Sequence, residues 1–169
     1  MKNLITLKMC AAVFLVFVSL ITEGAMADNL ERSKEFFDKL DRSQINLIDS
    51  FYDKDAIFQD PVHQLKGAAA IKAYYEGLYK NVEAIRFEYG KSIESGDTVS
   101  LTWRMYLKTA AIDDGNEITV DGVSVIIFGG EEGKVIAHRD YFDMGEFIYE
   151  RVFILRSVVG YIKDQLAGN

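Results

Sequence analysis

The sequence predicts an α+β fold: a group of helices, then a curved antiparallel sheet, then one more helix. Three observations lead to this prediction. Apolar residues recur at helical spacing as far as residue 79, β-branched and aromatic residues dominate residues 85–142, and helical spacing returns after Glu146. Helices and strands that are grouped rather than alternating favour α+β over α/β. A length of 169 residues suits one domain.

Three helices are expected before the sheet, over residues 30–40, 45–52 and 68–79. Either Asp41 or Ser43 is suited to cap the second helix, because both side chains accept hydrogen bonds from free backbone N–H groups. Between the second and third helices, residues 56–60 form a short strand. This strand ends at Pro61, since proline has no N–H for a strand ladder, and a loop then runs to Gly67.

Four strands are expected next, over residues 85–93, 98–108, 117–128 and 134–142. Their separators, such as Ser95-Gly96-Asp97, are typical of hairpin turns, so consecutive strands should pair antiparallel. Successive side chains on a strand point to opposite faces of the sheet. On the second and third of these strands, this alternation predicts one inward-facing set: Leu101, Trp103, Met105, Leu107, Gly122, Ser124, Ile126 and Phe128.

A final helix of about five turns is expected after Glu146. Its apolar residues follow one another at spacings of 4, 3, 4, 3 and 4 from Ile148 to Leu166. The opposite side mixes acidic and basic residues, which is unlike the basic stripe of a membrane-surface helix. We therefore expect the apolar side to cover the sheet of the same chain.

The first 27 residues have the pattern of a secretory signal peptide. Two lysines precede an uncharged apolar run over residues 9–21, and an Ala-x-Ala motif ends at Ala27. The run is shorter than the roughly 20 residues that a membrane-spanning helix needs. We expect cleavage before Asp28 and a periplasmic or secreted protein. The alternative is an N-terminal anchor that is not removed.

Charge and cysteine content exclude several classes of function. The formal net charge is −7, which repels phosphate backbones and anionic lipid headgroups, so nucleic acid and membrane surfaces are poor partners. The single cysteine, Cys10, lies in the expected signal peptide. The mature chain therefore has no disulfide, thiolate metal site or cysteine nucleophile. Small molecules and other proteins remain as partners.

Two segments resemble a known family. The stretch Asp55-Ala56-Ile57-Phe58-Gln59-Asp60-Pro61-Val62 and the stretch His138-Arg139-Asp140-Tyr141-Phe142-Asp143 are similar to the SnoaL-like and ketosteroid isomerase-like branch of the nuclear transport factor 2-like superfamily. The order of elements also agrees with that superfamily. The resemblance implies that residues 28–169 form a single SnoaL-like domain, in which a cone-shaped sheet wraps around the N-terminal helices and encloses a deep apolar pocket.

The resemblance also implies a function. We expect the pocket to bind a small hydrophobic molecule, either a carbonyl compound or a polycyclic one, with isomerase-type or cyclase-type acid–base catalysis and no cofactor. The alternative is a noncatalytic periplasmic module that binds a ligand or serves as a dimeric scaffold. A homodimer is compatible with either, and the fold alone does not choose between them.

Three residues are the candidate catalytic groups. By resemblance, Asp60 matches the general base of ketosteroid isomerases and Asp140 matches the acid–base carboxylate of SnoaL-like cyclases. Burial at the mouth of an apolar pocket is expected to raise the pKa of Asp60 toward a useful range. His138 shares a strand face with Asp140 and could orient it or share its proton.

The oxyanion hole of ketosteroid isomerases has no counterpart in the sequence. By resemblance, Phe36 or Phe37 replaces its tyrosine, and Ser124 replaces its protonated aspartic acid. A hydroxyl of one of the tyrosines Tyr74, Tyr75, Tyr79 and Tyr106 could take that role. Without such donors, steroid isomerisation is doubtful, because stabilising the enolate is usually the largest catalytic contribution.

Structural roles compete with the catalytic ones. Asp60 before a proline also suits a turn. Asp140 could be a buried partner of Arg104, Arg139 or His138. Alternation alone does not decide which face of the last strand points inward, since Tyr141 and Phe142 are both aromatic. The resemblance favours the face of His138, Asp140 and Phe142.

The remaining candidates are binding residues. The expected pocket lining is Trp103, Met105, Ile126, Phe128, Phe142 and Tyr75, with Ser124 as a polar group. His63 is expected at the rim. No metal site is expected, because the two histidines show no HxxxH or HxH spacing.

Overall fold

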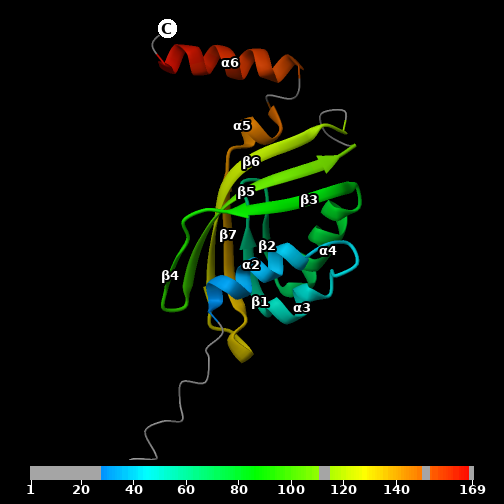
Figure 1. The fold of residues 1–169 in the computed structure, drawn as a ribbon, viewed down its shortest axis with the longest axis vertical. Helices are drawn as coiled ribbons and strands as arrows, with labels where there is room; N and C mark the ends of the chain where they lie inside the picture. Colours follow the sequence, from blue (N-terminus) through cyan, green and yellow to red (C-terminus); the bar gives the residue numbers. More distant parts are fainter. Residues whose placement is uncertain (1–27, 111–114, 150–152, 168–169) are drawn as a thin grey trace, which may run out of the picture.

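A computed structural model describes residues 28–110, 115–149 and 153–167 (Figure 1). It has the predicted α+β architecture, with helices packed against one curved, open sheet. The expected signal peptide, residues 1–27, lies outside the described residues. In the described ranges, no helix combines the length and the hydropathy needed to cross a membrane.

Seven strands form the sheet: β1 (Tyr52–Gln59), β2 (Gln64–Lys66), β3 (Val82–Tyr89), β4 (Ile93–Ser95), β5 (Thr98–Thr109), β6 (Glu117–Phe128) and β7 (Val135–Phe142). The strand order is β2-β1-β7-β6-β5-β3, and β4 pairs with β5. Neighbouring strands are antiparallel except β1 and β7, which are parallel. Strand β1 thus lies beside the last strand of the chain.

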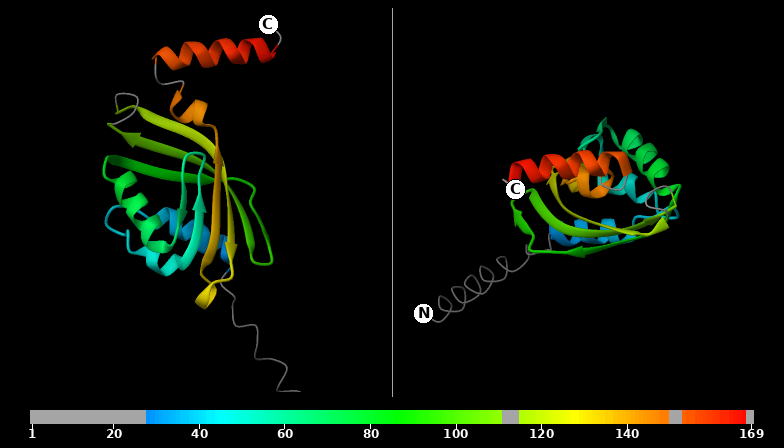
Figure 2. Two further views of the ribbon diagram at one scale, coloured as in Figure 1. Left: turned by 180° about the vertical axis from the view of Figure 1, so that it is seen from behind. Right: turned by 90° about the horizontal axis from the view of Figure 1, so that it is seen from above.

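The helices are α2 (Asn29–Lys39), α3 (Leu47–Phe51), α4 (Ala68–Tyr79), α5 (Met144–Phe147) and α6 (Phe153–Ala167), with a short 3₁₀ turn at Glu131–Gly133. Helices α2, α3 and α4 cover the concave face of the sheet (Figure 2). Helix α4 has the bounds that its apolar spacing predicted. It starts after Gly67, whose positive φ of 90° is easily reached only by glycine.

Several predicted elements differ from the observed ones. Strand β1 begins at Tyr52 rather than at residue 56, and β2 lies within the expected loop before Gly67. The strand expected over residues 85–93 is divided into β3 and β4 because the chain approaches β5 closely at Gly90, where a Cβ atom would lie 2.7 Å from the Thr102 hydroxyl. The second helix begins only at Leu47. Its expected cap, Asp41, instead closes a turn by accepting hydrogen bonds from the backbone of Ser43 and Gln44.

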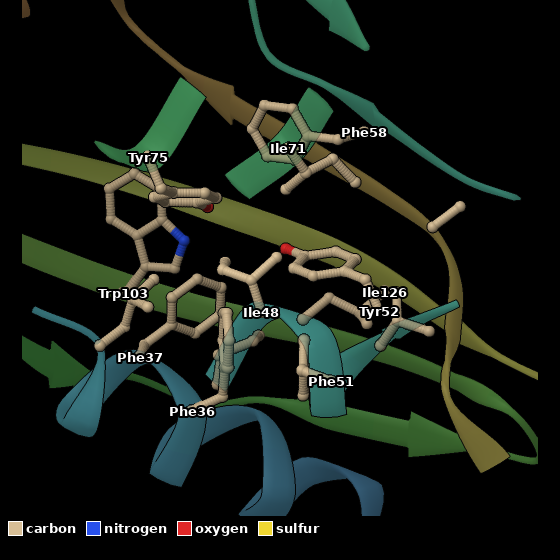
Figure 3. Packing of buried hydrophobic residues seen from close by; sticks show 14 of the residues in the cluster. Phe36, Phe37, Ile48, Phe51, Tyr52, Phe58, Ile71, Tyr75, Trp103 and Ile126 are labelled. Atoms are coloured by element: carbon tan, nitrogen blue, oxygen red, sulfur yellow. The ribbon is translucent and has the colours of Figure 1, made fainter. Parts of the chain in front are cut away.

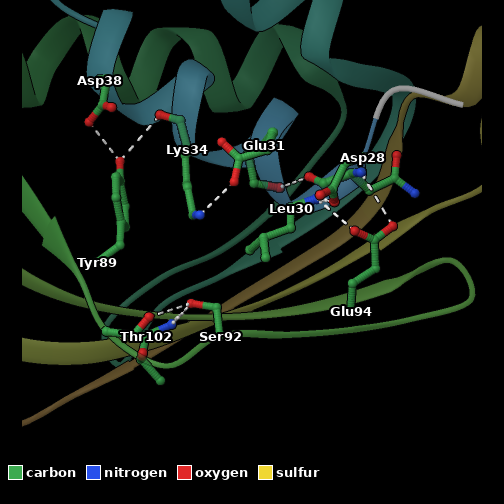
Figure 4. Close-up of polar contacts among 12 residues, drawn as sticks. Asp28, Leu30, Glu31, Lys34, Asp38, Tyr89, Ser92, Glu94 and Thr102 are labelled. Carbon is green, nitrogen blue, oxygen red and sulfur yellow. Dashed lines mark hydrogen bonds and ion pairs between the residues drawn. The ribbon is translucent and has the colours of Figure 1, made fainter. Parts of the chain in front are cut away.

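Polar contacts fix helix α2 against the edge of the sheet (Figure 4). Asp28 caps the helix by accepting from the Leu30 N–H at 3.0 Å, and Glu94 of β4 accepts from the same N–H at 3.0 Å. Further along the helix, the Tyr89 hydroxyl donates to Asp38 at 2.8 Å. These contacts hold α2 so that Phe37 points toward the centre of the concave face.

The core is an aromatic cluster between α2, α3 and the sheet (Figure 3). The rings of Phe36 and Phe51 stack with centroids 3.9 Å apart, and both rings meet Tyr52 edge to face. Phe51 also contacts Phe128 of β6 edge to face. This cluster fills one end of the concave face, so any open space must lie toward the other end.

Helix α6 does not cover the sheet, contrary to the sequence-based expectation. It lies beyond α5 and away from the sheet in both side views (Figures 1 and 2). Its apolar residues Ile162 and Leu166 are 51% and 83% exposed. The concave face is already covered by α2, α3 and α4, which leaves α6 no place there. Residue 152, which belongs to the predicted stripe, lies outside the described residues.

Candidate functional site

A small cavity remains at the other end of the concave face, between α4, α5 and strands β3, β5, β6 and β7. Its volume is about 100 Å³. The wall is mostly apolar and aromatic, and it includes Phe37 from α2, Phe58 from β1, Phe87 from β3 and Phe147 from α5. Three polar residues interrupt this wall: Asp60, Ser124 and Asp140.

Asp140 is held in place through one of its two carboxylate oxygens. Oδ1 lies 2.5 Å from Ser124 Oγ and 2.8 Å from His138 Nε2. The indole Nε1–H of Trp103 donates to Ser124 Oγ at 2.9 Å. Since an indole N–H only donates, the Ser124 hydrogen is left to bond Asp140. The other oxygen, Oδ2, has no hydrogen-bond partner among the described residues, and the side chain, 14% exposed, lines the cavity.

His138 lies behind Asp140, within the core. Its side chain is fully buried, and its Nδ1 is 2.6 Å from the Tyr52 hydroxyl. Burial, together with the nearby Asp140, raises the pKa of Tyr52 well above its ordinary value, so this hydroxyl keeps its proton. A neutral imidazole satisfies all three groups when Tyr52 donates to Nδ1 and Nε2–H donates to Asp140. This arrangement allows His138 to orient Asp140, which is one of the two roles expected for this pair.

Asp60 is held in a turn at the edge of the cavity. Its carboxylate accepts from the backbone N–H groups of Val62 and His63 and from the Tyr74 hydroxyl at 2.8 Å, and it lies 3.1 Å from His63 Nδ1. Burial acts to raise the pKa of Asp60, but these hydrogen bonds outweigh it and lower the pKa below its ordinary value. The expectation of a raised pKa is therefore wrong, because the site offers more donors than the sequence revealed.

The charges of both carboxylates, Asp60 and Asp140, affect the pKa of Tyr74. Burial raises the pKa of Tyr74, and the hydrogen bond to Asp60 and the charges of Asp60 and Asp140 act in the same direction. One hydroxyl thus lies within the field of both carboxylates. Asp60 and Asp140 both line the same cavity.

The structure places most of the predicted binding residues at the cavity. Trp103, Met105, Phe142 and Tyr75 line it, as does Ser124. The inward face of β7 is that of His138, Asp140 and Phe142, whereas Tyr141 is 45% exposed.

Four predicted site residues lie outside the cavity lining. Ile126 and Phe128 do face inward, but they are buried at 0% and 3% exposure in the core beneath α2 and α3, where Phe51 packs on Phe128. His138 is also behind the cavity wall. His63 contacts Asp60 and Tyr74 from the solvent side, and it is not part of the lining.

Sequence reasoning missed two important groups. Tyr52 was expected at the end of a helix, yet it begins β1 and bonds His138. Alternation gave no signal for this placement, because Lys54, between Tyr52 and the inward Ala56, is exposed and the pairing with β7 shifts register between Tyr52 and Ile57. Tyr74 was expected only as one of four tyrosines that could supply an oxyanion donor, and only the folded turn brings Asp60 to its hydroxyl.

Within the described ranges, no group of three or more His, Cys, Asp or Glu side chains is arranged to hold a metal ion. The polar groups at the cavity are two carboxylates, a serine hydroxyl and tyrosine hydroxyls. This inventory suits proton transfer and the binding of small molecules.

Comparison with known proteins agrees with the fold. Residues 33–138, well over half of the chain, match the family model described as the SnoaL-like domain. The chain belongs to the SnoaL-like family. No curated protein sequence matches it. The match runs from α2 to His138 in β7, and so covers the elements that surround the cavity except the end of β7 and α5.

Solved structures share the SnoaL-like fold at low sequence identity. An NTF2-like protein of unknown function from Burkholderia pseudomallei has a TM-score of 0.64 and 18% identity, over 75% of this chain and 99% of that chain. A candidate SnoaL-like polyketide cyclase from Shewanella denitrificans has a TM-score of 0.59 and 17% identity, over 66% and 88% of the two chains.

A third structure is of an enzyme with a described role. SalBIII, an epoxide hydrolase/cyclase-like enzyme of pyran ring formation in the polyether salinomycin, has a TM-score of 0.59 and 20% identity, over 69% of this chain and 91% of its own. The SnoaL-like chain described here is thus related in fold to cyclases and isomerases.

Proposed function

We propose that this SnoaL-like protein binds a small apolar molecule in the cavity and that Asp140 exchanges a proton with it. The main support for this proposal is that the two oxygens of the Asp140 carboxylate have different surroundings. One oxygen is fixed by Ser124 and His138, the other has no hydrogen-bond partner among the described residues, and the side chain lines the cavity. A base that is fixed in orientation but free at one oxygen is suited to proton transfer.

The other groups support Asp140 in this proposal. Ser124 and His138 position the carboxylate, and Trp103 in turn orients Ser124. Asp60 is already stabilised as an anion by its turn, so it holds Tyr74 rather than serving as the base. The aromatic wall excludes water, which strengthens electrostatic interactions with a bound molecule.

The cavity size limits the bound molecule. A dry cavity of about 150 Å³ holds benzene, and ligand pockets for drug-sized molecules span roughly 300–1,000 Å³. With about 100 Å³, this cavity accepts a molecule of no more than one small ring unless its walls move. A polycyclic ligand, as the family resemblance suggested, requires α4 and α5 to separate.

Deuterium exchange tests the proton transfer. Short cyclic ketones are incubated with the protein in D₂O, and exchange beside the carbonyl is followed by NMR. We expect Asp140→Asn to lower the exchange rate by about 100-fold or more, because a positioned general base contributes about that factor. The matched control is Asp121→Asn, an exposed strand aspartate that pairs with Arg104 on the outer face. Equal rates in the Asp140→Asn variant would remove Asp140 from the mechanism.

A noncatalytic binding module is the second candidate, and one observation favours it. The donors beside the carboxylates are already used: Trp103 donates to Ser124, Ser124 to Asp140, and Tyr74 to Asp60. An enolate formed in the cavity would find none of these three hydrogens free. Saturable ligand binding without any deuterium exchange in the wild-type protein would decide for this candidate.

We also propose that residues 1–27 direct export and are removed. The apolar run and the Ala-x-Ala motif support this proposal. Expression of the full chain in a Gram-negative bacterium, followed by fractionation and N-terminal sequencing, tests it. The expected product is a periplasmic protein that begins at Asp28. A full-length chain in the membrane fraction would overturn the proposal.

A further inference from the structure

The polar groups beside the two carboxylates of the cavity leave acceptors rather than donors for a ligand. Trp103, Ser124 and Tyr74 all direct their hydrogens at protein oxygens. Asp140 lines the cavity, and its Oδ2 has no hydrogen-bond partner among the described residues. Among the described residues of the cavity lining there is no lysine, arginine or histidine. An anion would therefore meet a carboxylate without a neutralising partner in the lining, whereas a cation would meet an attractive group.

The aromatic wall of the cavity also favours a cation over an anion. Nine of the lining residues are aromatic, and they come from α2, α4, α5 and four strands of the sheet. The rings of Phe37, Tyr75 and Trp103 lie near one another at one side of the buried cluster (Figure 3). The face of an aromatic ring carries negative electrostatic potential, so a ring-lined cavity attracts organic cations.

Shape and size narrow the ligand further. A volume of about 100 Å³ suits a compact group rather than an extended chain. Metal ions and protonated primary amines are strongly hydrated, and this wall offers few oxygens to replace their water. An ammonium that carries methyl groups is weakly hydrated and apolar at its surface. It matches a cavity that combines rings with one open carboxylate oxygen.

We propose that the cavity binds a small alkylated ammonium cation, with its charge against Asp140 and its methyl groups against the aromatic rings. This inference rests on the proposal that the cavity is the ligand site, and it adds a cationic ligand class to the neutral ketones that test proton transfer. A fixed positive charge needs no hydrogen-bond donor from the protein. A ligand of this class therefore suits a site in which the hydrogen-bond donors beside both carboxylates already bond protein oxygens.

Tetramethylammonium and tert-butanol form the test pair, because they have the same number of heavy atoms and a similar shape but differ in charge. Trp103 is the only tryptophan of the chain and lines the cavity, so its indole N–H resonance reports binding at this site alone. Each compound is titrated up to about 50 mM, since weak ligands bind in the millimolar range. We expect tetramethylammonium to bind at least about tenfold more tightly than tert-butanol.

Two variants separate the contributions of charge and ring. Asp140→Asn removes the charge, and we expect it to weaken tetramethylammonium binding by about tenfold while changing tert-butanol binding by less than about twofold. Phe142→Leu keeps apolar bulk without the ring, and we expect about a 3- to 30-fold loss for the cation only. Tyr141→Leu, on the opposite face of the same strand, is the matched control and should change neither affinity.

Each contrary outcome has a distinct meaning. If tert-butanol binds as tightly as tetramethylammonium, the cation inference is wrong and the cavity remains a site for neutral ligands. If neither compound moves the Trp103 resonance, or if both variants bind the cation as the wild type does, the inference is equally wrong. Deuterium exchange into ketones still tests the proposed proton transfer, so the two proposals fail independently.

Discussion

The Asp60 carboxylate illustrates how hydrogen bonds at a single residue can outweigh desolvation. Its pKa is lowered in the folded protein from an ordinary value of 3.8, despite burial. Because the folded pKa is depressed, the stabilisation is present above the unfolded pKa and is lost as pH falls through the folded pKa. We expect Asp60→Asn to lower the free energy of unfolding by about 1–2 kcal/mol at pH 7, and the difference from wild type to shrink below pH 3.8.

Urea unfolding of wild type and Asp60→Asn at several pH values measures this difference. The exposed Asp55, which precedes Asp60 in the same strand region, supplies the control Asp55→Asn. A difference between wild type and Asp60→Asn that grows on acidification would contradict the direction of the pKa shift.

Ser124 is a second residue whose role is defined by its partners. It accepts from the buried Trp103 indole and bonds Asp140, and it is itself only 1% exposed. We expect Ser124→Ala to cost about 1–3 kcal/mol of stability, because a buried N–H loses its acceptor. Ser100→Ala, on the neighbouring strand, should stay within about 0.5 kcal/mol of wild type. Urea unfolding monitored by Trp103 fluorescence checks both values.

The sequence predicted part of this site at the residue scale. Asp140 and His138 share a face by simple alternation along a strand, and the family resemblance chose the inward face, which their burial now supports. The lowered pKa of Asp60 could not be predicted. It depends on Tyr74, fourteen residues away in a helix, and on the local path of the turn.

At the scale of elements, the close pairing of β5 with β6 requires a glycine opposite a tryptophan. Gly122 pairs in register with Trp103, and a Cβ atom at position 122 would overlap the indole ring. We expect Gly122→Ala to destabilise the protein by about 1–3 kcal/mol and to displace the indole, as overpacking does. A changed Trp103 fluorescence maximum and a lower urea midpoint are the measurements.

Gly77 provides the matched control for that prediction. It lies in α4, and a Cβ atom there would meet nothing within 4 Å. Gly77→Ala should stabilise the protein by about 0.5–1 kcal/mol, since alanine favours a helix over glycine. A destabilisation by Gly77→Ala equal to that of Gly122→Ala would show that the register contact with Trp103 is not the cause.

The bounds of an element could be predicted when the residues that mark its ends lie within the element itself. Helix α4 and strand β6 have the predicted bounds, because apolar spacing and turn residues mark both ends within the segment itself. The division between β3 and β4 follows from a close approach of Gly90 to Thr102 in another strand. A contact of that kind has no signature in the segment that it divides.

At the scale of the whole molecule, the concave face is divided between a filled end and an open end. Ile126 and Phe128 share a strand face with Ser124. The aromatic cluster of α2 and α3 packs at Ile126 and Phe128 and does not extend to Ser124. Strand alternation predicts which residues point inward, whereas the position of the helices decides which of them meet the cavity. The cavity residues were therefore predicted better on β5 and β7 than on β6.

Helix α6 provides the last prediction, because Ile162 and Leu166, two described residues of its apolar stripe, are largely exposed. Tyr161, Ile162 and Leu166 are 66%, 51% and 83% exposed, and hydrophobic stabilisation scales with the area removed from water. We expect a chain that ends at Tyr149 to unfold within about 1 kcal/mol of the full chain, and to keep the Trp103 indole N–H resonance unchanged. Urea unfolding and NMR of the two chains make the comparison. A loss of more than about 2 kcal/mol would mean that α6 packs against the sheet in solution, as its sequence pattern alone predicted.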